Sequence, residues 1–113
     1  MKPPALIALM SIALVSTARA ELTIDDYERS KDESQTIAYV IGIGTAYSWA
    51  NVSLLHDMQK PLYCPPLHLA INGSNYLDLM NDAIGAAKSR NVPPDVTIAL
   101  LLLEQLKFTF PCR

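Results

Sequence analysis

Two cysteines and two histidines are the residues of this chain with the greatest capacity for chemistry. Cys64 and Cys112 are its only thiols, and His56 and His68 are its only imidazoles. A cysteine beside a histidine can act as a nucleophile, and such side chains can also bind a metal ion or form a disulfide. The histidines lie 12 residues apart, and neither belongs to a CxxC or HxxxH pattern, so we expect no metal site.

The first twenty residues bear on the state of the thiols, because they carry the pattern of an export signal. Lys2 precedes an apolar run from Ala5 to Val15, and Ala18-Arg19-Ala20 presents small residues at the two positions that signal peptidase recognises. The run is about half the roughly 20 residues that a membrane span needs. We predict a signal peptide at residues 1–20, cleavage after Ala20, and no stable membrane insertion afterwards.

An exported chain meets an oxidising compartment, where thiols tend to pair. We therefore predict a disulfide between Cys64 and Cys112, with a catalytic Cys–His pair as the alternative. The disulfide would close a loop of 49 residues. Closing a loop of that length stabilises a protein by about 4 kcal/mol, which is a large part of a total stability of about 5–15 kcal/mol.

Two further groups are weaker candidates for chemistry. Asp78 and Asp82 lie one helical turn apart, where a carboxylate pair can do acid–base work or bind a metal, but exposed aspartates more often only solubilise a surface. Gly42-Ile43-Gly44 lacks the third glycine, the preceding strand and the helix start of a phosphate-binding loop. We predict no catalytic residue, no cofactor and no enzymatic activity.

A polar cluster is the candidate for binding a partner. His56, Asp57, Gln59 and Lys60 form the most polar part of the main irregular stretch, residues 53–75. Loops carry function more often than cores do, so we predict that these four residues contact a partner protein. A solvated connection between helices is the alternative.

Four helical segments must position these residues, and we expect them over about 24–30, 33–52, 75–90 and 94–109. Thr23 with Asp26 fits a capping box, Ser30 or Asp32 and then Ser74 or Asn75 are the expected caps of the next two helices, and Pro94 fits the first turn of the last one. No residue from Thr36 to Ala50 is charged, which predicts a buried core helix. The predicted fold class is all-α, a small bundle of about four helices with one disulfide.

The chain of 113 residues has the size of one domain, assigned to residues 21–113. Without Lys2 and Arg19, seven basic and eleven acidic residues remain, a net charge of −4 that lies entirely in residues 21–33. An acidic balance argues against nucleic-acid binding. The acidic segment either steers a cationic partner or starts a solvated first helix.

The centre of the last predicted helix, Ile98 to Leu103, is apolar on all sides. Such a helix is buried all round, which three partners in a small bundle can hardly achieve. Either a homodimer interface or the long irregular stretch is expected to cover it.

The order of motifs in most of the chain resembles a known family. Tyr63-Cys64-Pro65-Pro66, a helix, a Val92-Pro93-Pro94 break, an apolar helix and terminal Phe110-Pro111-Cys112 follow one another as in the Rap/Tai immunity proteins of bacterial type VI secretion systems. The resemblance covers residues 36–112 and includes Tyr39-Val40-Ile41-Gly42, where Ala38 replaces the family's first glycine. Family members commonly carry further cysteines in the first half, which this chain lacks.

The resemblance implies a periplasmic, all-helical, often dimeric protein that binds and blocks a peptidoglycan amidase toxin. We expect inhibition by occlusion of the toxin's active-site cleft, with a few buried side chains supplying most of the affinity. Four aromatic residues are candidate anchors, although core packing explains them as well: Tyr47, Trp49, Tyr63 and Tyr76. The alternative is a small periplasmic acid-stress chaperone of the HdeA type, although this chain lacks that type's characteristic start and its lysine-rich body.

Overall fold

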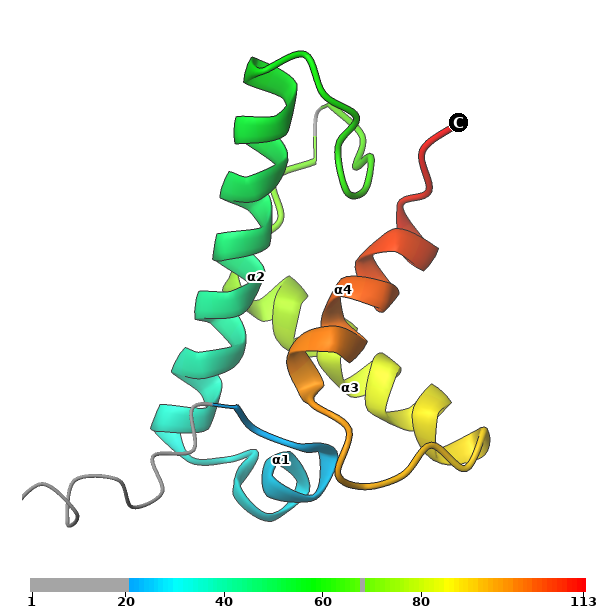
Figure 1. Cartoon of the computed structure of the whole chain (residues 1–113). Helices are drawn as coiled ribbons and strands as arrows, with labels where there is room; N and C mark the ends of the chain where they lie inside the picture. Colours follow the sequence, from blue (N-terminus) through cyan, green and yellow to red (C-terminus); the bar gives the residue numbers. More distant parts are fainter. Residues whose placement is uncertain (1–20, 68) are drawn as a thin grey trace, which may run out of the picture.

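The computed structural model describes residues 21–67 and 69–113, so the predicted signal peptide at 1–20 and His68 lie outside the described residues. Four helices make up this part: α1 (Ile24–Ser30), α2 (Ser34–His56), α3 (Gly73–Ser89) and α4 (Ile98–Thr109) (Figure 1). The predicted all-α fold of about four helices with one disulfide is confirmed. Within the described residues, no helix has both the length and the apolar character of a membrane span.

The first helix begins where its capping residues predict. The Thr23 hydroxyl accepts a hydrogen bond from the Asp26 amide at 3.1 Å, and the Asp26 carboxylate accepts one from the Thr23 amide at 3.0 Å. This reciprocal pair is a capping box, and it satisfies two amides that have no partner inside the helix.

The second helix differs from its prediction at both ends. Its N-cap is Glu33, which makes no side-chain capping bond. Ser30, one of the two predicted caps, is engaged elsewhere: its hydroxyl donates to the Asp26 carbonyl and accepts from the Thr36 hydroxyl. The helix also continues to His56, four residues beyond the predicted end, because nothing in the sequence between 52 and 56 stops it.

The third helix begins earlier than predicted. Its cap is Asn72 rather than Ser74 or Asn75, and Asn72 and Asn75 form a second capping box with N···O distances of 3.1 and 3.0 Å. An asparagine at the third helical position thus plays the part that the usual glutamate or glutamine plays.

The fourth helix starts at Ile98 instead of residue 94. The preceding residues form a turn that bonds to the start of the described chain: the Ile24 amide donates to the Val96 carbonyl at 3.0 Å, and the Ile98 amide donates to the Leu22 carbonyl at 2.9 Å. Thr23 and Thr97 form an isolated antiparallel bridge at this point. Pro94 therefore lies in a connection, where its carbonyl accepts from the Asp25 amide.

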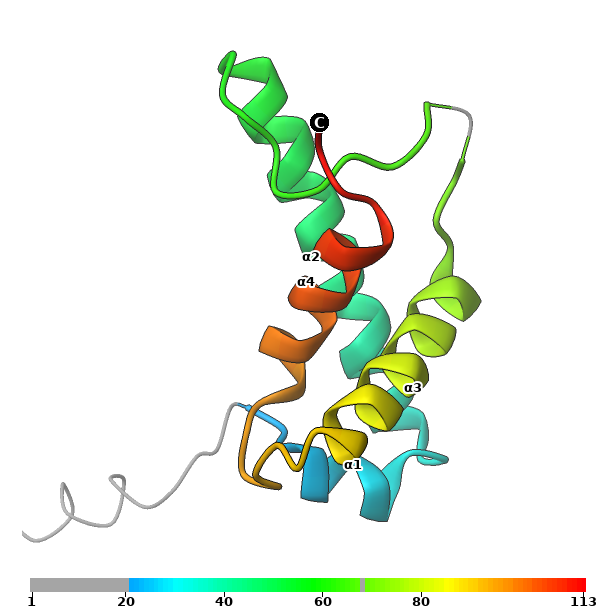
Figure 2. The same ribbon diagram turned by 90° about the vertical axis from the view of Figure 1, so that its right-hand side faces the viewer.

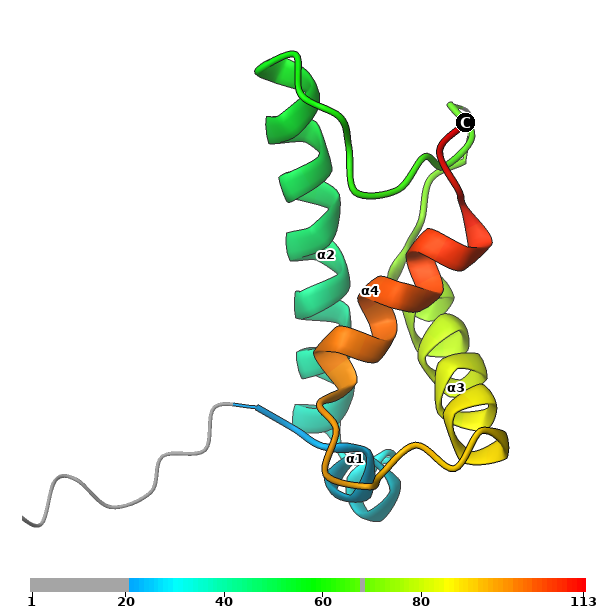
Figure 3. The same ribbon diagram turned by 45° about the vertical axis from the view of Figure 1, so that its right-hand side comes forward.

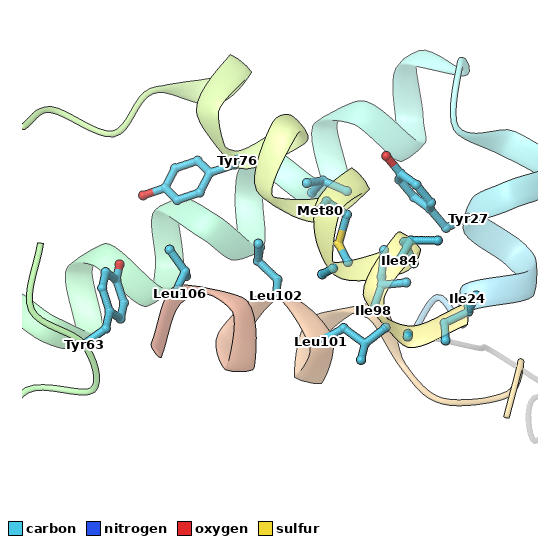
Figure 4. Close-up of a cluster of buried hydrophobic side chains, with 13 residues drawn as sticks. Ile24, Tyr27, Tyr63, Tyr76, Met80, Ile84, Ile98, Leu101, Leu102 and Leu106 are labelled. Atoms are coloured by element: carbon cyan, nitrogen blue, oxygen red, sulfur yellow. The ribbon is translucent and has the colours of Figure 1, made fainter. Parts of the chain in front are cut away.

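The helices enclose one core, in which α3 packs against both α4 and α2 (Figures 2 and 3). Figure 4 shows Tyr76 and Met80 of α3 facing Leu102 and Leu106 of α4. The crossing of α2 and α3 depends on Gly44, since a Cβ atom there would collide with the ring of Tyr76.

Two expectations about burial change. Most of the last helix is covered by other parts of the same chain, because Ile98, Leu101, Leu102 and Leu106 are buried. Leu100, which is 51% exposed, is an exception. The uncharged α2, predicted to be a buried core helix, instead lies at one edge of the bundle with a whole face in solvent (Figure 1).

Candidate functional site

The chain turns back after the end of α2, and Asn51 holds it in place at Leu62 and Tyr63. The Asn51 amide nitrogen donates to the Tyr63 carbonyl and its carbonyl oxygen accepts from the Leu62 amide, both at 2.8 Å. The bond to Tyr63 is buried and the bond to Leu62 is partly buried; because the Asn51 side chain is itself buried, leaving its amide unpaired would be costly.

The predicted disulfide holds this part of the chain from the other side. Cys64 and Cys112 are bonded, with their Cα atoms 5.0 Å apart, and the Cys64 amide donates to the Phe110 carbonyl at 2.8 Å. Neither cysteine is free, so the alternative of a catalytic Cys–His pair is wrong. The bridge ties the end of the chain to residues 61–64.

These attachments leave an open groove of about 520 Å³ between the second half of α2 and residues 61–67 and 69–71. None of the described residues that line it is charged, and they include Val52, Leu55, Leu67 and Leu69. Four other hollows on the described chain each include charged side chains. An uncharged, largely apolar groove is suited to an apolar side chain of a partner.

The end of α2 beside this groove carries an unusual residue. The Gln59 amide donates to the Leu54 carbonyl at 2.7 Å and the Met58 amide to the Leu55 carbonyl at 3.0 Å, which is a Schellman closure. Met58 therefore occupies the left-handed region, with φ of 59°, where glycine is the usual residue. Its side chain is 92% exposed, so neither the backbone nor the core explains the choice of methionine.

The four predicted partner-binding residues, His56, Asp57, Gln59 and Lys60, are all exposed around Met58. Nδ1 of His56 lies 3.3 Å from the Asp57 carboxylate. The prediction missed the apolar residues of the adjoining groove, of which Leu67 is 97% exposed. We define the apical surface as these four polar residues together with Leu55, Met58, Leu67 and Leu69.

Of the four aromatic candidates for anchors, two belong to the core. Tyr63 and Tyr76 are buried, and burial together with the neighbouring Tyr76 hydroxyl raises the pKa of Tyr63 to about 12. Tyr47 is half-buried and donates to the Ala99 carbonyl at 2.8 Å. Trp49 is 68% exposed and lies on the outer side of α2. Among these four, Trp49 alone presents most of its surface to a partner.

Asp78 and Asp82 are both exposed on α3, as the prediction of a solvated pair requires. Among residues 21–67 and 69–113, no group of three or more histidine, cysteine, aspartate or glutamate side chains is placed to hold a metal ion.

In comparisons with known proteins, no family model, no curated protein and no solved structure matches this chain.

Proposed function

We propose that this protein is a periplasmic immunity protein, which binds a peptidoglycan amidase toxin and blocks its active-site cleft. The observation that carries the proposal is the apical surface, where exposed apolar side chains lie beside a neutral groove and are surrounded by polar residues. A dry centre within a polar rim is the usual anatomy of a protein-binding surface. The order of sequence motifs shared with the Rap/Tai family supplies the class of partner.

The shape of the apical surface suits occlusion. Met58 and the four polar residues lie at the far end of α2, which extends beyond the ends of the other helices (Figures 1 and 3). This projecting end can enter a concave cleft with Met58, while His56, Asp57, Gln59 and Lys60 contact the rim of that cleft and Leu67 offers a second contact across the groove. Inhibition of this kind needs no reaction by the inhibitor, because it acts by excluding the substrate.

Met58 supports a binding role in a further way. A non-glycine residue in the left-handed region costs about 1 kcal/mol, and exposure gives no packing in return. Binding of a partner supplies the missing contact, because a methionine side chain adapts to irregular apolar surfaces. The local cost is then offset in the complex rather than in the free protein.

The test is a competition between sister cells. Deleting the gene should make a strain sensitive to its toxin-secreting sisters, and the wild-type gene should restore survival. We expect the double variant Met58→Asp with Leu67→Asp to fail to restore it, because two carboxylates would enter the apolar contact. Survival of the deletion strain at the wild-type level overturns the proposal.

A matched variant separates binding from folding. Met58→Gly preserves the left-handed turn, removes the exposed side chain and should raise stability by about 1 kcal/mol. Reduced protection by a more stable protein identifies Met58 as a contact residue. Full protection by both Met58→Gly and the double aspartate variant places the toxin contact elsewhere and refutes the role of the apical surface.

A further inference from the structure

The outer face of α2 is apolar and uncovered, and its residues follow a regular spacing. Alternating steps of four and three residues connect the centre line of this face, Ala38, Gly42, Thr45, Trp49, Val52 and His56, all of which are exposed, and Ala46, Ser48 and Ser53 are exposed beside it. At 3.6 residues per turn these positions lie on the side of α2 opposite to buried Val40, Gly44 and Asn51. This is the spacing of a helix that packs against another helix.

The absence of charge on this face limits which helix can pack against it. No residue from Ser34 to Leu55 is charged, so the face from Ala38 to Val52 offers nothing to a charged partner; His56, at its end, lies 3.3 Å from the Asp57 carboxylate. The face also has no lysine or arginine with which amphipathic helices hold anionic membranes. The partner of this face must be a helix that is itself uncharged, because a charge buried there would have no counter-charge. A second copy of α2 meets this condition.

The side chains in the two halves of the face differ in size, and this difference favours the packing of two copies. Ala38, Gly42 and Thr45 are small, whereas Trp49 and Val52 are large. When two such helices run antiparallel about a two-fold axis near residue 47, Thr45 of each lies beside Trp49 of the other. In the same register Gly42 lies beside Val52, so each large side chain faces a small one.

Gly42 provides an independent reason to expect a second helix on this face. A glycine inside a helix costs about 1 kcal/mol relative to alanine, and a reason for it is expected in the packing. For Gly44 that reason is Tyr76, but a Cβ atom at Gly42 would meet no atom of the described chain within 4 Å outside its own helical turn. Its missing side chain therefore serves no contact within one molecule, whereas it admits a neighbouring helix.

We propose that this protein forms a homodimer through antiparallel packing of the outer faces of two α2 helices. The contact runs over about 27 Å between Ala38 and His56 at 1.5 Å per residue. It differs from the dimer predicted from sequence, which was to cover the last helix. The proposal does not rest on the toxin-binding role, since Ala38, Gly42, Thr45 and Trp49 lie outside the apical surface and its groove; only Val52 and His56 lie where the two surfaces meet.

Sedimentation equilibrium of the purified protein tests the dimer with a matched pair of variants. Gly42 and Gly85 are both exposed helical glycines with open space at the Cβ position, but Gly85 lies on α3. We expect a wild-type dimer, a dissociation constant raised by about tenfold or more in Gly42→Glu, and no change in Gly85→Glu, because a buried unpaired carboxylate is costly. A wild-type protein that is monomeric at about 1 mM, or equal effects of the two variants, overturns the proposal.

Trp49 gives a second readout, since it is the chain's single tryptophan. Its fluorescence emission should shift to shorter wavelength as dimer forms, and an unchanged emission during dimerisation overturns the role of this face. Orientation is tested by a short thiol cross-linker. Thr45→Cys chains should cross-link, as the paired sites lie about 6 Å apart along the axis, and Ala38→Cys chains should not, at about 27 Å. Cross-linking through position 38 refutes the antiparallel arrangement.

Discussion

Replacement of Gly44 by alanine tests the packing of α2 on α3. A Cβ atom at this position would lie 2.7 Å from Cδ2 of Tyr76 and closer still to two other ring atoms, where ordinary contacts begin near 3.4 Å. The ring is 2% exposed, so it has little room to move. Overpacking of this kind costs about 1–3 kcal/mol.

Gly42→Ala is the matched control, because it lies in the same helix with open space at the Cβ position. Both substitutions gain about 1 kcal/mol of helix propensity, which cancels when the two variants are compared. We therefore expect Gly44→Ala to be less stable than Gly42→Ala by about 1–3 kcal/mol, a difference of about 4–8 °C in melting temperature for each kcal/mol.

Urea denaturation followed by circular dichroism measures this difference, at protein concentrations low enough to keep the chain monomeric. Equal stabilities of the two variants, within about 0.5 kcal/mol, would refute the reasoning. They would mean that the Tyr76 ring does not rest on the backbone of α2, and that another contact determines how α2 crosses α3.

Three further predictions concern residues 61–64. Replacing Cys64 and Cys112 together by serine should lower the free energy of unfolding by about 2–5 kcal/mol, and a reducing agent should have the same effect on the wild-type protein in urea titrations. Asn51→Ala removes one buried and one partly buried hydrogen bond and should cost about 1–3 kcal/mol in the same assay; a neutral result would contradict the role of Asn51 in holding Leu62 and Tyr63. Burial raises the pKa of Tyr63 from 10.0 to about 12, so its contribution to stability is complete below pH 10 and is lost as pH rises toward 12, because the unfolded chain ionises first. The urea midpoint should consequently fall less steeply over this range in Tyr63→Phe than in the wild-type protein.

The helices were predictable where local chemistry decides their limits. Thr23 and Asp26 are three residues apart and form their capping box without help from distant residues. The start of α4 was not predictable, because residues 94–98 bond to residues 22–25, which lie far away in the sequence. Pro94 has the right type for a first helical turn, and only the tertiary pairing places it outside the helix.

The candidate site was likewise predictable only in part. The sequence shows that His56, Asp57, Gln59 and Lys60 are polar, and all four are exposed. Periodicity alone does not tell which apolar residues remain outside the core, since α2 is apolar on every side. The outward position of Trp49 follows from the packing of α2 on α3 and α4, which no local pattern specifies.

An antiparallel α2 pair also determines where two apical surfaces lie. Each surface is at the C-terminal end of its own α2, so the two-fold axis places the pair at opposite ends of the dimer. Leu55 is eight residues from the axis near residue 47, which separates the two Leu55 positions by about 24 Å along the helices. Val52 lines the groove and also belongs to the outer face, so the partner-binding surface and the dimer interface adjoin at this side chain. Small changes at Val52 therefore couple the two interfaces, whereas Met58 acts on the apical surface alone and Gly42 on the outer face alone.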